Sequence, residues 1–384
     1  MKRLCWCVVL VGLLLGLLPL GAAAAGPEVP AKSAVLMDVA TGTLLHESNA
    51  HEPLAPASVT KVMTLLLIME AIDNGTLRWE DSVTASETAA AKGGSQIYLK
   101  PGESMSVADM VKSIAVSSAN DCACAMAEHL AGSESAFVDR MNARAEELGM
   151  KNTHFVNCTG LDDSPEAKEH RTSAYDIALM SRQLLKYHPE ITKYTTIWMD
   201  TVRNGTFGLS NTNKLIRFYA GATGLKTGFT SGAGYCLSAS AKREELELIA
   251  VVMGSESSQD RFSACKQLLD YGFAGYSLIQ PEAGEDTSVP VKLGKLQTVR
   301  AVPGSEEPLL IQKSQRNSVT SQIRLEESVT APVSKGQRLG ELVIQSGEQV
   351  LARIPLVAEA PVERLTWGQL FLRALKRICT GNLD

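Results

Sequence analysis

The spacing of apolar residues changes along the chain, and each change predicts a different kind of element. Short β-type runs flank a long middle part in which apolar residues recur every three or four positions, as on one face of a helix. Strands are expected at residues 33–39, 43–45, 224–229, 234–240 and 246–253, and helices at 107–115, 121–131, 134–148, 173–186 and 259–271. Strands at both ends of a helical middle predict an α+β domain with one antiparallel sheet and a helical cluster, here placed at residues 26–277.

Another buried helix is expected to begin directly after Pro56 and to end at Asn74-Gly75. Apolar residues between Val62 and Ile68 recur at helical spacing, which indicates burial. The segment from Thr84 to Lys100 is instead polar and rich in small residues, so it predicts a surface loop.

Beyond residue 277 the pattern becomes one of short β-type runs separated by glycine, proline and charged turns. These runs lie at residues 289–291, 297–302, 309–312, 322–325, 341–344 and 350–355. They predict a small all-β domain at 288–361, in which we expect no catalytic residue.

The last apolar pattern lies in residues 363–380, where Trp367 and Phe371 share one helical face and Arg373 and Lys376 lie on the other. A basic amphipathic helix with large aromatic residues is suited to lying in a membrane interface. The same pattern also fits a helix packed on the β domain, and the sequence leaves both interpretations open.

The first 25 residues have the three parts of an export signal: Lys2-Arg3, the apolar stretch Leu4 to Leu20, and small residues up to Ala25. A retained transmembrane anchor is the alternative interpretation. With the signal removed, the protein is expected to be exported and extracytoplasmic. The C-terminal helix would then attach it peripherally to the outer face of the cytoplasmic membrane.

Composition narrows the possible partners. Hydrophobic residues make up 45% of the chain and charged residues 21%, which is enough for a packed core, and the net charge of −5 gives no reason to expect a nucleic acid partner. The chain has no Cys-x-x-Cys and no His pair at ligand spacing, so we expect no metal and no cofactor.

The six cysteines beyond the signal are interpreted as core residues: Cys122, Cys124, Cys158, Cys236, Cys265 and Cys379.

The first candidate for chemistry is the pair Ser58 and Lys61 at the start of the helix that follows Pro56. Residues three apart share a helical face, so the serine hydroxyl and the lysine amine are expected side by side. Burial and a helix N-terminus lower a lysine pKa, and a neutral amine can take the serine proton. A Ser-x-x-Lys sequence alone is weak, because a second one occurs at Ser263 and Lys266.

Two later triplets strengthen the first pair. Ser118-Ala119-Asn120 places a hydroxyl and an amide two residues apart, and Lys226-Thr-Gly228 lies in an expected edge strand. Ser-x-x-Lys, a Ser-x-Asn triplet and Lys-Thr-Gly, in this order, are the signature of penicillin-binding proteins and class A β-lactamases. The pair Ser263 and Lys266 lies after the Lys-Thr-Gly strand and is set aside.

With these motifs, nearly the whole mature chain resembles the low-molecular-mass penicillin-binding proteins, which are serine-type D-alanyl-D-alanine carboxypeptidases. The segments that resemble the family include Leu99-Lys-Pro-Gly102, Met150-Lys-Asn-Thr-His-Phe155, Gly160-Leu-Asp162 and Ala233-Gly-Tyr235. The resemblance implies a β-lactamase/transpeptidase-like fold for the first domain. It also implies a peptidoglycan stem pentapeptide as substrate and β-lactams as inhibitors.

For catalysis, the resemblance implies that Ser58 attacks the bond between the last two D-alanines and that Lys61 takes its proton. Ser118 and Asn120 would relay protons and hold the substrate amide. The backbone N–H groups of Ser58 and of a residue near Phe229 would form the oxyanion hole.

For binding, it implies that Lys226, Thr227 and Gly228 hold the carboxylate region of the substrate, helped by Arg261. Some members of the family have a histidine at the position of Phe229, so no deacylation role of that histidine carries over to this chain.

Three other interpretations are weighed against this one. A β-lactamase would rely on a Glu-x-x-Leu-Asn loop before the Lys-Thr-Gly strand, and the chain has none. A non-catalytic penicillin-binding or sensing module would not need all three triplets intact. Cleavage of peptide cross-links, an endopeptidase activity, is a variant that the sequence leaves open.

Overall fold

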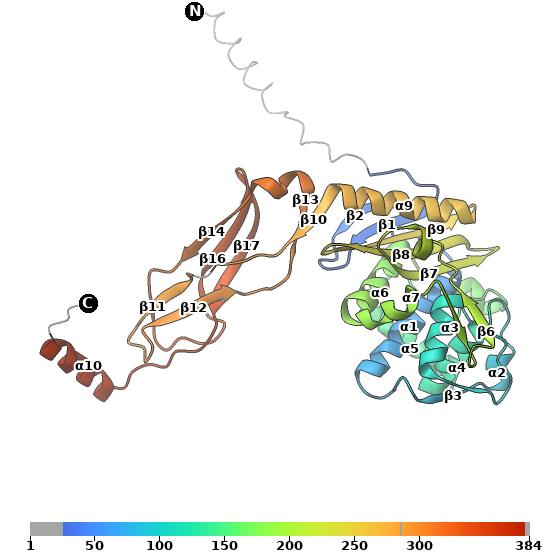
Figure 1. Cartoon of the computed structure of the whole chain (residues 1–384), viewed down its shortest axis with the longest axis horizontal. Helices are drawn as coiled ribbons and strands as arrows, with labels where there is room; N and C mark the ends of the chain where they lie inside the picture. Colours follow the sequence, from blue (N-terminus) through green and yellow to red (C-terminus); the bar gives the residue numbers. More distant parts are fainter. Residues whose placement is uncertain (1–25, 285, 381–384) are drawn as a thin grey trace, which may run out of the picture.

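The structure is a computed structural model and describes residues 26–284 and 286–380. The predicted export signal, residues 1–25, lies outside the described residues. Figure 1 shows a larger part made of a sheet and helices, a smaller β part, and a single helix at the end remote from the larger part.

The larger domain is built on a five-stranded antiparallel sheet with the order β2-β1-β9-β8-β7. Its strands are β1 (Ser33–Asp38), β2 (Leu44–Ser48), β7 (Ala222–Thr230), β8 (Gly234–Arg243) and β9 (Leu246–Ser255). The first and last parts of the domain therefore pair within one sheet, which confirms the α+β prediction. Strand β7 lies at one edge of this sheet, as expected for the Lys-Thr-Gly strand.

The helical cluster is formed by the middle of the chain. Its helical elements are η1 (Ala57–Thr60), α1 (Lys61–Asp73), α2 (Glu87–Ala90), α3 (Val107–Ser117), α4 (Asn120–Ala131), α5 (Glu134–Glu147), η2 (Pro165–Glu169), α6 (Ala174–Tyr187), η3 (Pro189–Ile191), α7 (Thr192–Thr195) and α8 (Leu215–Phe218). Two short strand pairs complete it, β3 (Ser82–Thr84) with β4 (Ser104–Ser106) and β5 (Met199–Val202) with β6 (Phe207–Ser210). Helix α1 is apolar on all sides and is the central helix of the cluster.

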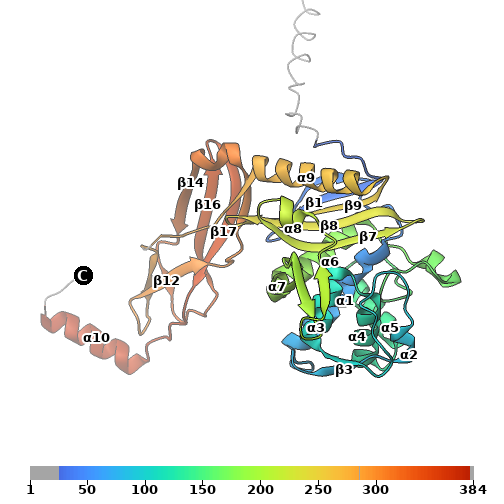
Figure 2. The ribbon, with the colours of Figure 1, turned by 45° about the vertical axis from the view of Figure 1, so that its right-hand side comes forward.

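The sheet is covered on both faces. Helix α9 (Ser258–Gly275) lies across one face, where Leu248 and Val252 of β9 pack against it. The helical cluster covers the other face, toward which Ile249 and Val251 point (Figure 2). Because successive residues of a strand point to opposite faces, burial on both sides gives β9 its continuous apolar run.

The smaller domain has a six-stranded sheet with the order β14-β16-β17-β12-β11-β15. Its elements are β10 (Tyr276–Ile279), β11 (Ser288–Lys292), β12 (Thr298–Pro303), β13 (Leu309–Gln312), η4 (Lys313–Ser318), β14 (Val319–Leu325), β15 (Val329–Thr330), β16 (Arg338–Ser346) and β17 (Gln349–Ala358). Five of the six expected β-type runs lie wholly within these strands, and 297–302 is shifted by one residue.

The expected surface loop at 84–100 is wrong in part. The segment contains the short helix α2, and Ile97 and Leu99 are buried. The end of the segment is anchored to the interior of the domain. The buried Asp121 carboxylate accepts the backbone N–H groups of Ile97 and Leu99 at 3.1 and 2.9 Å. Sequence patterns carry no sign of such a long-range anchor.

The terminal helix α10 (Trp367–Thr380) begins four residues later than expected. Thr366 explains the start, because its Oγ1 accepts the N–H of Gln369 while the Gln369 side chain accepts the N–H of Thr366. Before that point, residues 362–365 belong to the β domain, since Val362 and Leu365 make backbone hydrogen bonds to it. Among the described residues, no helix has the length and apolar character needed to cross a membrane.

Candidate active site

Ser58 lies in a 3-10 turn, η1, and not in the first turn of the α-helix as the sequence predicts. In a 3-10 turn the residues i and i+3 are aligned, so Lys61, the first residue of α1, lies directly beside Ser58. The Lys61 Nζ atom is 2.9 Å from Ser58 Oγ. Ala57, just before the serine, has a φ of 47°, a left-handed conformation that is costly for a residue with a side chain.

The Lys61 amine is fully buried, and its second partner is the backbone carbonyl of Thr159 at 2.8 Å. Burial lowers the pKa of Lys61 to about 7, while the nearby Cys158 and Asp121 side chains act in the opposite direction. Near neutral pH a large fraction of this amine is therefore uncharged. An uncharged amine 2.9 Å from a hydroxyl can accept its proton.

The Ser-x-Asn triplet forms the turn between α3 and α4, where Ser118 has a φ of 63°. The Asn120 Nδ2 atom donates to the Gly93 carbonyl at 2.7 Å, which fixes the orientation of the amide. Its Oδ1 atom is buried and has no hydrogen-bond partner in the described part of the chain. A buried acceptor without a partner is suited to receive an N–H group from a ligand.

Strand β7 passes directly against η1, and Gly228 makes this approach possible. A Cβ atom at residue 228 would lie 2.7 Å from the carbonyl oxygen of Pro56 and 3.1 Å from the backbone nitrogen of Ser58. Thr227 Oγ1 on the same strand donates to Thr212 Oγ1 at 2.7 Å. The structure thus brings the Lys-Thr-Gly strand to the Ser58 turn.

Lys226 is buried on β7, and its Nζ atom donates to the Thr227 carbonyl at 2.9 Å. Burial, and then the positive charges of Lys61 and Arg261, hold the pKa of Lys226 well below its usual range. Among the described residues, none of these three cations forms an ion pair. Because Lys226 is close enough to feel both Lys61 and Arg261 and has no counter-ion among the described residues, this region favours an anionic ligand.

Arg261 reaches the back of β7 from the first turn of α9. Its Nη1 atom donates to the carbonyls of Gly228 at 2.9 Å and Cys236 at 3.4 Å, and the guanidinium lies over the Tyr235 ring. Its Nε atom is buried without a partner among the described residues. In this position Arg261 supports the strand and retains one N–H group for a ligand.

Two further contributors were missed by sequence reasoning. Gly160 has a φ of 80°, and a Cβ there would lie 1.8 Å from the Ala57 carbonyl oxygen, so only glycine lets this loop bring Thr159 to Lys61. On the other side, His170 Nδ1 accepts the Val156 N–H, so its Nε2 donates to Thr60 Oγ1 at 2.8 Å. The Thr60 hydroxyl then donates to the Ala57 carbonyl at 2.8 Å.

His170 stays neutral near pH 7, because burial, helped by His154 and Lys61, lowers its pKa to about 4. It therefore holds the Ser58 turn through Thr60 without adding charge. For the loop that carries Thr159, the only indication in the sequence is the family-like segment Gly160-Leu-Asp162. No sequence pattern indicates the role of His170.

The five described cysteines beyond the signal, Cys122, Cys124, Cys158, Cys236 and Cys265, are buried free thiols. This confirms their interpretation as core residues. The side chain of Cys379 is outside the described set. Among the described residues, no group of three His, Cys, Asp or Glu side chains is arranged to hold a metal ion.

Comparison with known proteins places this arrangement in a family. Residues 21–257 match the family model described as D-alanyl-D-alanine carboxypeptidase, and residues 280–364 match the C-terminal domain of penicillin-binding protein 5. The chain therefore belongs to the D-alanyl-D-alanine carboxypeptidases, the serine peptidases of the penicillin-binding class.

Individual relatives agree. The D-alanyl-D-alanine carboxypeptidase DacF of Bacillus subtilis is 44% identical over 90% of this chain and 88% of its own length. Penicillin-binding protein 5 of Haemophilus influenzae has a TM-score of 0.76 at 31% identity, over 88% of this chain and 99% of that one. Penicillin-binding protein D2 of Listeria monocytogenes, solved with ampicillin bound, has a TM-score of 0.59 at 32% identity, over 64% of this chain and 100% of that one.

The contact between β7 and η1 can be tested by Gly228→Ala. The new methyl group must push the Pro56 carbonyl away, so we expect a loss of about 1–3 kcal/mol in the free energy of unfolding. Equilibrium urea unfolding measures it, with Trp79 and Trp198 as reporters in the larger domain. The matched control is Gly232→Ala in the adjacent turn, where the nearest atom is 3.8 Å away and the change should stay within about 0.5 kcal/mol. Equal stability of the two variants would contradict the close contact.

Proposed function

We propose that Ser58 is the nucleophile of this carboxypeptidase and that Lys61 is its general base. The observation that carries the proposal is the buried Lys61 amine, 2.9 Å from Ser58 Oγ and with a pKa lowered to about 7. The substrate is the peptidoglycan stem pentapeptide, and the bond cleaved joins its last two D-alanines. The family supports this substrate, since the relatives above carry the same activity in their names.

The proton and the electrons move as follows. The Ser58 hydroxyl gives its proton to Lys61 Nζ while Oγ bonds to the carbonyl carbon of the substrate. The resulting oxyanion accepts hydrogen bonds from the backbone N–H groups of Ser58 and Phe229, which lie where η1 and β7 meet. When the carbon–nitrogen bond breaks, the leaving D-alanine amine takes a proton from Lys61 by way of the Ser118 hydroxyl.

The substrate lies along the exposed edge of β7. Its terminal carboxylate meets Lys226 and Thr227, with Arg261 behind the strand, and supplies the counter-ion that the cations lack. The unpaired Asn120 Oδ1 accepts a substrate amide N–H. An extended peptide paired to a strand edge in this way is held by its backbone, while the cationic groups select a free carboxylate end.

Water then releases the acyl group from Ser58, with Lys61 as the activating base. Phe229 offers no base, and its half-exposed ring stacks on Tyr235 with 4.3 Å between centroids. The β-lactamase alternative gains no support from Glu166 and Glu169 in η2, because both side chains are exposed to solvent. A β-lactam would acylate Ser58 in the same way and leave slowly.

We further propose that the chain is exported by residues 1–25 and attached peripherally to the membrane by α10. Trp367, Phe371 and Ile378 are 88, 68 and 79% exposed, and this apolar surface packs on no other described element. A helix packed on the β domain would bury these rings, so the exposure favours the membrane interface.

Replacing the nucleophile tests the catalytic proposal. Ser58→Ala should abolish release of D-alanine from a stem pentapeptide and should leave the protein folded. Chromatographic assay of free D-alanine measures the activity, and thermal unfolding checks the fold. D-alanine release at the wild-type rate would refute the role of Ser58. If wild type instead turns over benzylpenicillin rapidly, with no long-lived adduct in its intact mass, the β-lactamase alternative gains.

The pH dependence follows from the pKa of Lys61. Only the neutral amine accepts the serine proton, so the rate constant for acylation by benzylpenicillin should rise with pH, with a midpoint near 7. Single-turnover measurements from about pH 5 to pH 9 give the profile. Lys61→Arg, which stays charged, should show no such rise at any pH. A rate that falls as the pH rises through the midpoint is incompatible with Lys61 as base.

Truncation tests the membrane proposal. Ending the chain after Thr366 keeps the residues that pair with the β domain and removes α10. We expect this protein to stay active but to lose sedimentation with vesicles of phosphatidylethanolamine and phosphatidylglycerol. The matched variant Trp367→Ser with Phe371→Ser keeps the chain length and should also lose it. Unchanged sedimentation of both proteins would rule α10 out as the attachment.

A further inference from the structure

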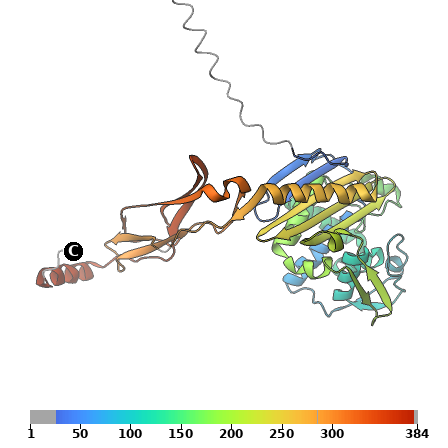
Figure 3. The same ribbon diagram turned by 45° about the horizontal axis from the view of Figure 1, so that its top comes forward.

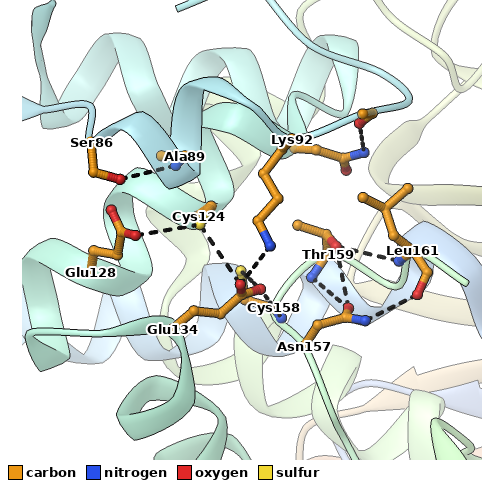
Figure 4. Close-up of polar contacts among 12 residues, drawn as sticks. Ser86, Ala89, Lys92, Cys124, Glu128, Glu134, Asn157, Cys158, Thr159 and Leu161 are labelled. Atoms are coloured by element: carbon orange, nitrogen blue, oxygen red, sulfur yellow. Dashed lines mark hydrogen bonds and ion pairs between the residues drawn. The ribbon is translucent and has the colours of Figure 1, made fainter. Parts of the chain in front are cut away.

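A partly buried ion pair lies near Lys61 and Asn120 but belongs to none of the three motifs. Lys92, after α2, and Glu134, at the start of α5, place Nζ and Oε2 2.6 Å apart, with about a fifth of each side chain exposed. Figure 4 shows the lysine amine directed at the Glu134 carboxylate between α4 and the loop that contains Asn157 and Thr159.

On the glutamate side, the pair is tied to Lys61. Glu134 Oε1 accepts both the backbone N–H and the thiol of Cys158 at 3.2 Å, and the Cys124 thiol lies 3.8 Å from Oε2. The next residue, Thr159, carries the carbonyl that accepts Lys61 Nζ at 2.8 Å. Glu134 thus holds the residue before this carbonyl, while Asn157 Oδ1 accepts the N–H groups of Thr159 and Gly160 from the other side.

On the lysine side, the pair is tied to Asn120. Lys92 directly precedes Gly93, whose carbonyl accepts Asn120 Nδ2 at 2.7 Å. Two residues further on, the Ser95 carbonyl accepts the backbone N–H of Asn120, also at 2.7 Å. The short segment from Lys92 to Ser95 therefore sets both the backbone position and the amide orientation of Asn120.

We propose that Lys92 and Glu134 form a positioning pair that holds Lys61 and Asn120 in register for acyl transfer. The inference rests on the roles proposed above for Lys61 and Asn120. A charge-assisted hydrogen bond has a defined length and direction, so it fixes the two loops relative to each other. A buried ion pair contributes little net stability compared with a well-packed apolar pair, and precise geometry is what it adds.

The pair stays ionised over the working pH range. Burial acts to raise the pKa of Glu134, but the hydrogen bonds from Lys92 and Cys158 outweigh it, and the pKa is lowered overall. Burial likewise acts to lower the pKa of Lys92, and Glu134 outweighs it and raises that pKa. The other titratable groups around the pair are Cys124 and Cys158, with Glu128 beyond Cys124. The pair therefore acts through position and not through its own titration.

The test replaces the pair without removing its packing. Lys92→Met with Glu134→Met fills the same space with apolar atoms, so the fold should keep its melting temperature to within a few degrees. Since nothing then holds the Cys158 N–H, we expect acylation by benzylpenicillin to fall about tenfold to a hundredfold. Lys92→Arg, which keeps the charge and the hydrogen bond, should retain most of the rate.

The pH profile gives a second readout. An ammonium that loses the Thr159 carbonyl loses stabilisation of its charged form, so the midpoint near 7 should move to lower pH in the double Met variant. Cys158 and Asp121 act on the pKa of Lys61, and Lys61 acts on those of Lys226 and His170; the substitutions replace none of these four residues, and of the four only Cys158 loses a contact, its hydrogen bond to Glu134. A purely structural role would leave this midpoint where it is.

A second ion pair provides the control. Glu70 and Arg144 are 2.8 Å apart with 24 and 21% exposure, join α1 to α5, and contact none of the loops at Ser58, Asn120 or Thr159. Glu70→Met with Arg144→Met should leave the acylation rate within about twofold of wild type. This range corresponds to the energy change of about 0.5 kcal/mol that is typical of surface substitutions.

The outcomes separate the two proposals. Wild-type acylation rate and pH midpoint in the double Met variant at positions 92 and 134 would overturn the positioning role while leaving Ser58 and Lys61 as proposed. An equal loss in both double Met variants would also overturn it, because the effect would then be general. If benzylpenicillin instead leaves no adduct on wild type, the proposed chemistry fails and the positioning role fails with it.

Discussion

The burial of one lysine amine is the constraint on which this active site depends. Lys61 begins the central helix of the cluster, and its amine has no contact with water. Removing a charge from water is costly, so the site is built to let this group lose its proton and still keep two hydrogen-bond partners. Those partners are Ser58 Oγ and the Thr159 carbonyl, both neutral. A carboxylate in either position would have kept the amine charged.

Much of the surrounding structure serves these two contacts. Gly160 lets the Thr159 loop approach η1, and Gly228 lets β7 approach the same turn from the other side. His170 and Thr60 hold the Ala57 carbonyl, so the strained residue before Ser58 is supported from within. Asp121, a carboxylate that acts on the pKa of Lys61, accepts the backbone N–H groups of Ile97, Leu99 and Cys122 and shapes the adjoining loop. Each support comes from a different segment of the larger domain.

Sequence patterns predicted the features that depend on side-chain type. They did not predict the contacts made by backbone carbonyl groups. The strands and the three motifs follow from periodicity and residue type, and the structure brings Ser58, Lys61 and the Lys-Thr-Gly strand together. The carbonyls of Thr159 and Gly93 could not be predicted from the sequence, because every residue has a backbone carbonyl. Only the fold determines which carbonyl lies next to Lys61 or Asn120. The 3-10 turn at Ser58 packs closely against β7, which lies more than 160 residues away in the chain, a contact that local sequence patterns do not reveal. The helical start at Thr366 was readable in principle from its capping box with Gln369, but the amphipathic pattern extended beyond it.

The electrostatics around Lys61 and Lys226 connect the proposed binding with the proposed catalysis. Burial disfavours the charged form of Lys226, and the charges of Lys61 and Arg261 add to this effect. The burial of both amines favours an arrangement in which at least one of them is neutral. In the proposed binding mode, a substrate carboxylate beside Lys226 would let Lys226 carry the charge. Lys61, which faces the neutral Thr159 carbonyl, then remains the amine that is free to be uncharged. In the proposed mechanism, the cations that bind the carboxylate end would therefore also determine which of the two lysines is the base.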